Sequence, residues 1–289
     1  MIQLIAESGS TKTSWYLIQQ SKVICTTQTL GMNPYFVQQS ELISILREVV
    51  IFLDGQAGGS TRGQIAAVLF YGSGYGNPET KKLLKEAFDQ VFIDVPVQIE
   101  TDLLAAARAL FGHEPGIVCI MGTGSNCGMY DGIDFTDNVP SLGFSLGDEG
   151  SAGFFGKWIV RDYYFKSLPP QIEDYLNQHF QMDINITLDR LYRQKHGNAY
   201  IASFAQIIAT FREDDYILDL VERGIEEFMR IQLGYFSSST RRKVGMVGSV
   251  AYYHKEQISR ILARDGWDLV KVLQHPIQEL VAYHTHMEE

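Results

Sequence analysis

Two stretches of the sequence decide the fold, Glu7-Ser8-Gly9-Ser10-Thr11-Lys12-Thr13 and Met121-Gly122-Thr123-Gly124-Ser125-Asn126. Each follows a short apolar run, Ile2–Ala6 in the first case and Ile117–Met121 in the second. A strand that ends in a turn of Gly, Ser and Thr directs several backbone N–H groups and hydroxyls toward one point, as phosphate binding requires. Because two such turns occur in one chain, they predict two phosphate-binding hairpins that face each other across a cleft.

The periodicity of apolar residues predicts an α/β protein with two similar halves. The expected elements of the first half are strands at 2–6, 14–19, 23–28, 65–71 and 91–99 and helices at 42–52, 78–88 and 102–110. In the second half we expect strands at 117–121, 126–130, 243–247 and 269–273, one more near 133–135, helices from about 150 to 236 with breaks near Pro169-Pro170 and Gly197, and a final helix from Pro276. These patterns predict one domain over 1–112 with the C-terminal helix 276–289 packed on it, and another over 113–275 with a helical insertion.

Composition limits the partners of the chain. Its 289 residues carry a formal net charge of −10. Nucleic acids and anionic membranes require a basic surface, so we expect neither as a partner. The three cysteines, Cys25, Cys119 and Cys127, form neither a disulfide framework nor a metal knuckle by their spacing. A cytoplasmic protein is therefore expected.

The first turn carries residues suited to ATP and a metal ion. Thr11 and Lys12 are placed to contact phosphate oxygens, and we expect Gly9 and Ser10 to bind ATP with them. Glu7 is a candidate for holding hydrated Mg²⁺, since that ion keeps several waters and takes few carboxylates. An ordinary hairpin turn with a solvated lysine is the alternative.

The second turn has the same character. Gly122 and Gly124 let the backbone approach a ligand, and the hydroxyls of Thr123 and Ser125 supply donors. Asn126 stands where its amide would bind a polar substrate. A tight hairpin that merely favours Gly and Asn is again the alternative.

Acidic residues occur at two junctions between a loop or strand and a helix. Asp102 follows a predicted strand and begins a helix that Thr101 can cap. It is either a general base for a substrate hydroxyl or an acid that stabilises the helix dipole. In Gly143–Gly153, Asp148 and Glu149 lie between glycines before another helix; capping explains part of this pattern, and ligand binding by Asp148 is favoured.

A late strand ends in Gly248-Ser249, where small residues would let an adenine or ribose lie against the backbone. A plain turn between a strand and a helix explains this pair equally well.

Five motifs taken together resemble a known family. E-S-G-S-T-K-T, T-D-L-L-A-A-A-R-A, I-M-G-T-G-S-N-C-G, G-D-E-G-S-A and V-G-S-V occur in this order. They resemble the N-acetylglucosamine kinase family, which belongs with the BadF/BadG-type ATPases in the superfamily of sugar kinases, actin and heat-shock chaperones. The resemblance implies two ribonuclease-H-like (actin-like ATPase) domains that close over ATP·Mg²⁺ and a sugar in an interdomain cleft.

The resemblance also implies roles for individual residues. ATP contacts would come from Thr11, Thr123, Gly248 and Ser249, and sugar contacts from Asn33, Ser125, Asn126, Gly143 and Asp148. Asp102 would be the catalytic base. Leu142 stands where mammalian members carry a tryptophan, so the sequence leaves the sugar open.

The sequence thus predicts an ATP-dependent sugar kinase. It would transfer the γ-phosphoryl group to a hydroxyl of an amino sugar or N-acetylhexosamine, with N-acetylglucosamine as the first choice and ATP and Mg²⁺ as cofactors. A homodimer is left open. One alternative is an ATPase that activates an iron–sulfur dehydratase, which needs cysteines able to hold a cluster. The other is a non-catalytic protein that binds a nucleotide or a sugar.

Overall fold

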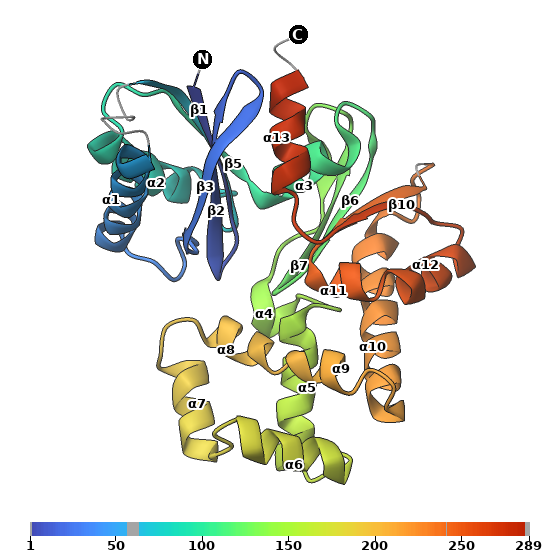
Figure 1. Cartoon of the computed structure of the whole chain (residues 1–289). Helices are drawn as coiled ribbons and strands as arrows, with labels where there is room; N and C mark the ends of the chain where they lie inside the picture. Colours follow the sequence, from blue (N-terminus) through green and yellow to red (C-terminus); the bar gives the residue numbers. More distant parts are fainter. Residues whose placement is uncertain (1, 57–63, 241, 287–289) are drawn as a thin grey trace. The chain divides into compact units, whose positions relative to one another are not determined.

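The computed structural model describes residues 2–56, 64–240 and 242–286 (Figure 1). The chain divides into two compact units, Met1–Gly112 with Pro276–Glu289 and His113–His275. Met1 and residues 287–289, which belong to the predicted first domain, lie outside the described residues. Among the described residues, no helix has the length and apolar character that a bilayer span requires.

A mixed five-stranded sheet forms the centre of the first unit. Its strands are β1 (Ile2–Ser8), β2 (Lys12–Gln19), β3 (Lys22–Leu30), β4 (Ile65–Gly72) and β5 (Val97–Thr101). They lie in the order β3-β2-β1-β4-β5. β1, β4 and β5 are parallel, whereas β2 and β3 form an antiparallel meander with β1. The carboxyl ends of three strands therefore meet at one edge of the sheet.

Helices cover both faces of this sheet. α1 (Gln39–Gln56) and α2 (Pro78–Val91) pack together on one face (Figure 1). Leu4 and Phe70 enter the core on this side of the sheet. α3 (Asp102–Phe111) and α13 (Ile277–His286) pack together on the other. Successive side chains of a strand point to opposite faces. Glu7 and Tyr71 consequently face the side that α3 and α13 cover.

The expected strand at 91–99 is wrong in its first half. Leu84, Ala87, Phe88 and Val91 are all buried, and this spacing continues the helical pattern of α2 to Val91. Asp94 has a φ of 59°, which marks a turn. The strand therefore begins only at Val97.

The second unit repeats the same sheet. Its strands are β6 (Gly116–Met121), β7 (Ser125–Tyr130), β8 (Phe135–Asn138), β9 (Lys243–Val247) and β10 (Asp268–Leu273), in the order β10-β9-β6-β7-β8. In chain order this is the arrangement of the first sheet, with an antiparallel meander followed by two parallel strands. The prediction of two similar α/β halves is confirmed.

β8 begins later than the expected strand near 133–135. The Asp131 carboxylate accepts hydrogen bonds from the backbone N–H groups of Ile133 and Asp134, at 2.8 and 2.9 Å. An aspartate that bonds to the backbone in this way makes a turn of its own. Ile133 therefore belongs to the turn and Phe135 starts the strand.

Helices account for the long segment between β8 and β9. They are α4 (Gly143–Leu146), α5 (Ala152–Tyr164), α6 (Pro170–His179), α7 (Ile184–Tyr192), α8 (Gly197–Ser203), α9 (Gln206–Thr210), α10 (Asp215–Phe228), the π-helical turn η2 (Met229–Leu233) and the 3₁₀ turn η3 (Gly234–Phe236). The predicted breaks coincide with the starts of α6 and α8. α11 (Ser249–Tyr253) and α12 (Lys255–Arg264) follow β9.

Close packing of α5 on α8 provides a test of this fold. A Cβ atom at Gly156 would lie 1.9 Å from the backbone oxygen of Ile201. Protein interiors are too closely packed to absorb that overlap without backbone movement. We expect Gly156→Ala to lower the free energy of unfolding by about 2–3 kcal/mol, measured by urea denaturation.

Gly234→Ala is the matched control in the same unit. Its new Cβ would lie 3.6 Å from its nearest neighbour, the Met229 oxygen, which is an ordinary contact. We expect a change within about 1 kcal/mol for this variant. Equal unfolding midpoints for the two variants would contradict the described packing of α5 on α8.

Candidate functional site

The first unit gathers its polar residues where β1, β4 and β5 end. The strand register aligns Ser8 with Gly72, and Gly72 with Thr101. Glu7 and Asp102 therefore lie at the same edge, one at the end of β1 and the other directly after β5. Ligands of α/β proteins bind at this edge because the loops that leave the strands surround it.

Hydrogen bonds fix the turn that joins β1 to β2. The Gly9 N–H donates to the Lys12 oxygen at 3.0 Å and closes the turn. Beneath it, the buried Ser8 hydroxyl lies 2.8 Å from the Thr13 hydroxyl and accepts from the Met32 N–H at 3.0 Å. The side chains of Thr11 and Lys12 are exposed. Hydrogen bonds of Ser8 therefore support the turn from inside the protein, and its outer side chains are accessible to a ligand.

Asn33 joins this turn to the loop after β4. Its amide nitrogen donates to the hydroxyls of Ser10 and Ser73, at 3.3 and 3.2 Å, and its Oδ1 accepts from the Tyr35 N–H at 3.0 Å. Both amide protons are thus engaged within the protein, and the side chain is only 8% exposed. Of its polar atoms, Oδ1 keeps capacity for a ligand, as an acceptor, so the predicted sugar contact of Asn33 would be made through this atom.

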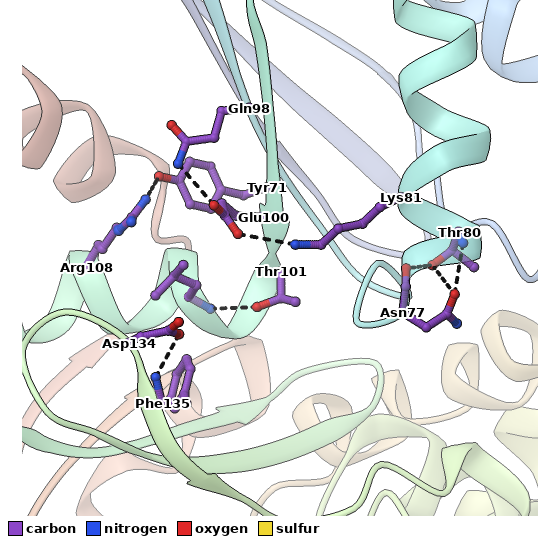
Figure 2. Close-up of polar contacts among 11 residues, drawn as sticks. Tyr71, Asn77, Thr80, Lys81, Gln98, Glu100, Thr101, Arg108, Asp134 and Phe135 are labelled. Carbon is purple, nitrogen blue, oxygen red and sulfur yellow. Dashed lines mark hydrogen bonds and ion pairs between the residues drawn. The ribbon is translucent and has the colours of Figure 1, made fainter.

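Asp102 begins α3. Thr101 caps the helix as expected, because its hydroxyl accepts from the Leu104 N–H at 3.2 Å (Figure 2). The Asp102 carboxylate accepts from the Leu103 N–H at 2.9 Å. Desolvation raises the pKa of Asp102 to about 6, although hydrogen bonds from the backbone oppose the shift. The group therefore takes up and releases a proton near neutral pH.

Glu7 is coupled to Asp102. Desolvation raises the pKa of Glu7 to about 7, the negative charge of Asp102 adds to the shift, and Lys12 opposes it. Two carboxyl groups with raised pKa values at one edge are typical of functional sites, since a purely structural role gives no reason to desolvate two like charges at the same edge.

A partly buried network attaches α3 to its neighbours. Arg108 donates to the Tyr71 hydroxyl, which lies 2.8 Å from Nε2 of His284 in α13 (Figure 2 shows Tyr71 and Arg108). Burial and the charge of Arg108 lower the pKa of His284 to about 4, so its ring is neutral. Because the Tyr71 oxygen already accepts from Arg108, its O–H is available to donate to Nε2 in the tautomer that carries its proton on Nδ1. The network fixes the helix that begins at Asp102, and no sequence motif indicated it.

In the second unit, three predicted motifs meet around the turn between β6 and β7. The Gly122 N–H donates to the Gly124 oxygen at 2.9 Å. Two N–H groups at the start of α5, from Ala152 and Gly153, donate to the oxygens of Gly122 and Thr123 at 2.8 and 3.0 Å. The turn therefore has its shape fixed by α5.

Gly248 packs against the same turn. Its φ is 127°, and a Cβ atom there would lie 2.3 Å from the Met121 oxygen. Only glycine fits both constraints. Ser249, the next residue, is exposed at the start of α11.

Asp148 contacts the turn directly. Its carboxylate accepts from the Ser125 N–H at 3.0 Å. Desolvation raises the pKa of Asp148, although the Ser125 hydrogen bond and Lys157 oppose the shift. Ser151 caps α5, with its hydroxyl accepting from the Phe154 N–H at 3.1 Å, so the expectation that the acids take part in capping is wrong.

A pocket of about 210 Å³ opens beside Asp148. Ser125 and Asn126 line it, together with Leu142 and with Gln232, which the sequence did not indicate. Gly143 begins the adjacent short helix α4 and is not among the lining residues. In this unit the structure thus brings Ser125, Asn126 and Asp148 to one cavity.

The cysteines of the second unit face one another across β6 and β7. The sulfur atoms of Cys119 and Cys127 are 2.9 Å apart, and both residues are free and buried. Within residues 2–56, 64–240 and 242–286, no group of three or more His, Cys, Asp or Glu residues is placed to hold a metal ion.

Comparison with solved structures shows close relatives of this fold. The structure is similar to that of a candidate N-acetylglucosamine kinase from Porphyromonas gingivalis, with 31% identity over 100% of both chains and a TM-score of 0.89. A candidate N-acetylglucosamine kinase from Chromobacterium violaceum has 17% identity, a TM-score of 0.73 and 98% coverage of both chains. No protein-family model and no curated protein matches the chain.

A more distant likeness extends to a ROK family glucokinase from Streptomyces griseus, solved in complex with glucose and AMPPNP. It has 15% identity, a TM-score of 0.55 and 98% coverage of both chains. The predicted fold class, two α/β domains of the actin-like ATPase type, is confirmed by these likenesses and by the repeated sheet.

The raised pKa of Asp102 predicts how stability depends on pH. Folding raises the pKa of this carboxyl group, so binding of its proton stabilises the folded state at low pH. That contribution to the free energy of unfolding is lost as the pH rises through about 6. Asp102→Asn keeps the acceptor for Leu103 but removes the desolvated charge. We expect it to raise the free energy of unfolding by about 1–3 kcal/mol at pH 8, with no gain below about pH 4.

Chemical denaturation of both proteins across this pH range would measure the difference. Asp174→Asn on the exposed side of α6 controls for the loss of one negative charge. If Asp102→Asn raised the free energy of unfolding equally at pH 4 and pH 8, the raised pKa of Asp102 would be contradicted.

Proposed function

The chain belongs to the N-acetylglucosamine kinase family and is a carbohydrate kinase, and we propose that it transfers the γ-phosphoryl group of ATP to a hydroxyl of an N-acetylhexosamine or amino sugar. N-acetylglucosamine is the proposed preferred acceptor. The observation that carries this proposal is Asp102, a desolvated carboxylate with a pKa of about 6, at the carboxyl edge of the first sheet.

Asp102 is the proposed catalytic base. Its carboxylate accepts the proton of the sugar hydroxyl while the oxygen forms a bond to the γ-phosphorus and the bond from phosphorus to the β,γ-bridging oxygen breaks, which releases ADP. A pKa near 6 leaves the group ionised at neutral pH and still basic enough to take a proton. Phosphoryl transfer depends mainly on positioning and charge stabilisation, so one oriented carboxylate suffices as the base.

The remaining predicted residues supply the other binding roles. In the first unit, Gly9–Lys12 is proposed to bind ATP phosphate, with the turn supported by Ser8 and Asn33. In the second, Gly122–Gly124 is proposed to bind phosphate and Gly248-Ser249 the adenosine. Ser125, Asn126, Gly143 and Asp148 are proposed sugar contacts or neighbours of the sugar.

The donor set at the first edge fits a hydrated magnesium ion. The charge of Asp102 raises the pKa of Glu7, and a nearby divalent cation would relieve this repulsion. We propose that Glu7 holds Mg²⁺ through water, as suits an ion that dehydrates reluctantly. When bound, the ion would neutralise charge on the transferring phosphoryl group.

The two alternative functions, activation of an iron–sulfur dehydratase and non-catalytic binding of a nucleotide or sugar, have less support from the described residues. An activator of an iron–sulfur dehydratase needs thiolates at the protein surface that can share a cluster, whereas Cys119 and Cys127 are buried between strands and burial raises the pKa of Cys119. A binding protein without catalysis has no need of the costly desolvated pair Glu7 and Asp102.

ADP release in the presence of different sugars tests the proposal. We expect turnover with N-acetylglucosamine above that with glucosamine, N-acetylmannosamine or N-acetylmuramic acid. Asp102→Asn should lower kcat by about 10²- to 10⁴-fold with a small change in KM, because the base acts in the transition state.

Asp174→Asn is the control and should retain the wild-type rate. Wild-type kcat in Asp102→Asn would remove Asp102 from the mechanism. Tight sugar binding without ATP consumption by the wild-type protein would instead favour a non-catalytic binding protein.

A further inference from the structure

The pocket beside Asp148 contains polar atoms that the protein leaves without partners. Ser125 Oγ and Gln232 Oε1 are buried and have no hydrogen-bond partner among the described residues, and both residues line the pocket. Burying such an atom unpaired costs free energy, and native proteins rarely do so without a reason. The two atoms therefore indicate a ligand with complementary polar groups.

Gln232 is held in one orientation by Glu149. Its amide nitrogen donates to a carboxylate oxygen of Glu149 at 2.8 Å, and both side chains are buried, 5% and 8% exposed. A carboxylate oxygen accepts hydrogen bonds, so the atom that faces Glu149 is the NH₂ group. Oε1 is consequently the free end of the amide, and it requires a donor.

A local departure from α-helical geometry places this side chain. Gln232 belongs to the π-helical turn η2, which continues α10. Its neighbours Met229 and Leu233 are buried in the core of the second unit, whereas Ile231, Gln232 and Tyr235 line the pocket. π-Helical turns change which side chains face a given side of a helix. Here the change brings an amide to a cavity wall.

The rest of the wall sets the character of the ligand. Val139, Leu142 and Ile231 supply apolar surface. Ser125 supplies a hydroxyl that can donate or accept. The volume of about 210 Å³ equals that of roughly seven waters at about 30 Å³ each, which is room for a substituent together with part of a sugar ring.

We propose that Gln232 is a specificity-determining residue that accepts a hydrogen bond from the amide N–H of an acetamido sugar. This inference rests on the proposed kinase function and deepens it by assigning the substrate class to a named side chain. The acetamido group offers an N–H for Gln232 Oε1, a carbonyl oxygen for the Ser125 hydroxyl and a methyl group for the apolar wall. An acceptor with an ester in place of the amide offers no donor and leaves Oε1 unpaired.

The test compares N-acetylglucosamine with 2-O-acetylglucose, which replaces the amide N–H by an ester oxygen in a similar shape. For the wild-type protein we expect kcat/KM to be about 10-fold higher for the amide, since one hydrogen bond separates the two substrates. In Gln232→Met, which keeps the length of the side chain but has no acceptor oxygen, the ratio should fall to near one. A merely structural effect would lower kcat/KM for both sugars and leave the ratio unchanged.

Gln178→Met on the exposed surface of α6 is the matched control and should keep the wild-type ratio. If Gln232→Met does not fold because Glu149 loses its donor, the comparison of the two sugars in the wild-type protein still decides. Equal kcat/KM for the amide and the ester in the wild-type protein, or an unchanged preference in a folded Gln232→Met, would overturn the inference. Phosphorylation of neither sugar would instead refute N-acetylglucosamine as the acceptor, and failure with every amino sugar of the ADP-release assay would refute the proposed function.

Discussion

The candidate site of the first unit depends on one costly constraint, the placement of two half-buried, desolvated carboxyl groups, Asp102 and Glu7, at one edge of the sheet. Desolvation raises the pKa values of both carboxyl groups, and the negative charge of Asp102 raises that of Glu7 further. Parallel strands bring the two groups to one side of the molecule, because β1 and β5 end at the same edge of one sheet. The Thr101 cap, the Asn33 amide and the network of Tyr71, Arg108 and His284 then hold the surrounding loops and α3.

In the second unit, backbone hydrogen bonds and close packing, rather than charged side chains, fix the shape of the glycine turn. Its turn at Gly122–Gly124 receives two N–H groups from α5 and packs against Gly248, so its shape is set before any ligand binds. Asp148 then bonds to Ser125 and borders a pocket that contains the free acceptor of Gln232. Preorganised donors and acceptors of this kind lose little entropy on binding, which is how a site gains selectivity.

Several of these features were predictable because they depend on neighbours in the chain. The strands before each glycine turn, the Thr101 cap and the start of α3 follow from local pattern. The prediction of a strand at 91–99 was wrong in its first half, because Val91 suits a helix face as well as a strand. Its burial on the inner face of α2 favours the helix. Gln232 was beyond prediction, since its role depends on a π-helical turn and on Glu149, which is 83 positions away in sequence. The engaged amide of Asn33 likewise depends on two distant serines.

The most direct measurement of the central claim is a pH titration of the Asp102 carboxyl carbon by NMR, in the wild-type protein and in Glu7→Gln. We expect the wild-type group to titrate near pH 6, because burial disfavours its charged form. Glu7 has the higher pKa, about 7, and is largely protonated when Asp102 titrates, so Glu7→Gln should leave the pKa of Asp102 near 6. An Asp102 that titrates near its ordinary value of 3.8 in the wild-type protein would contradict the account.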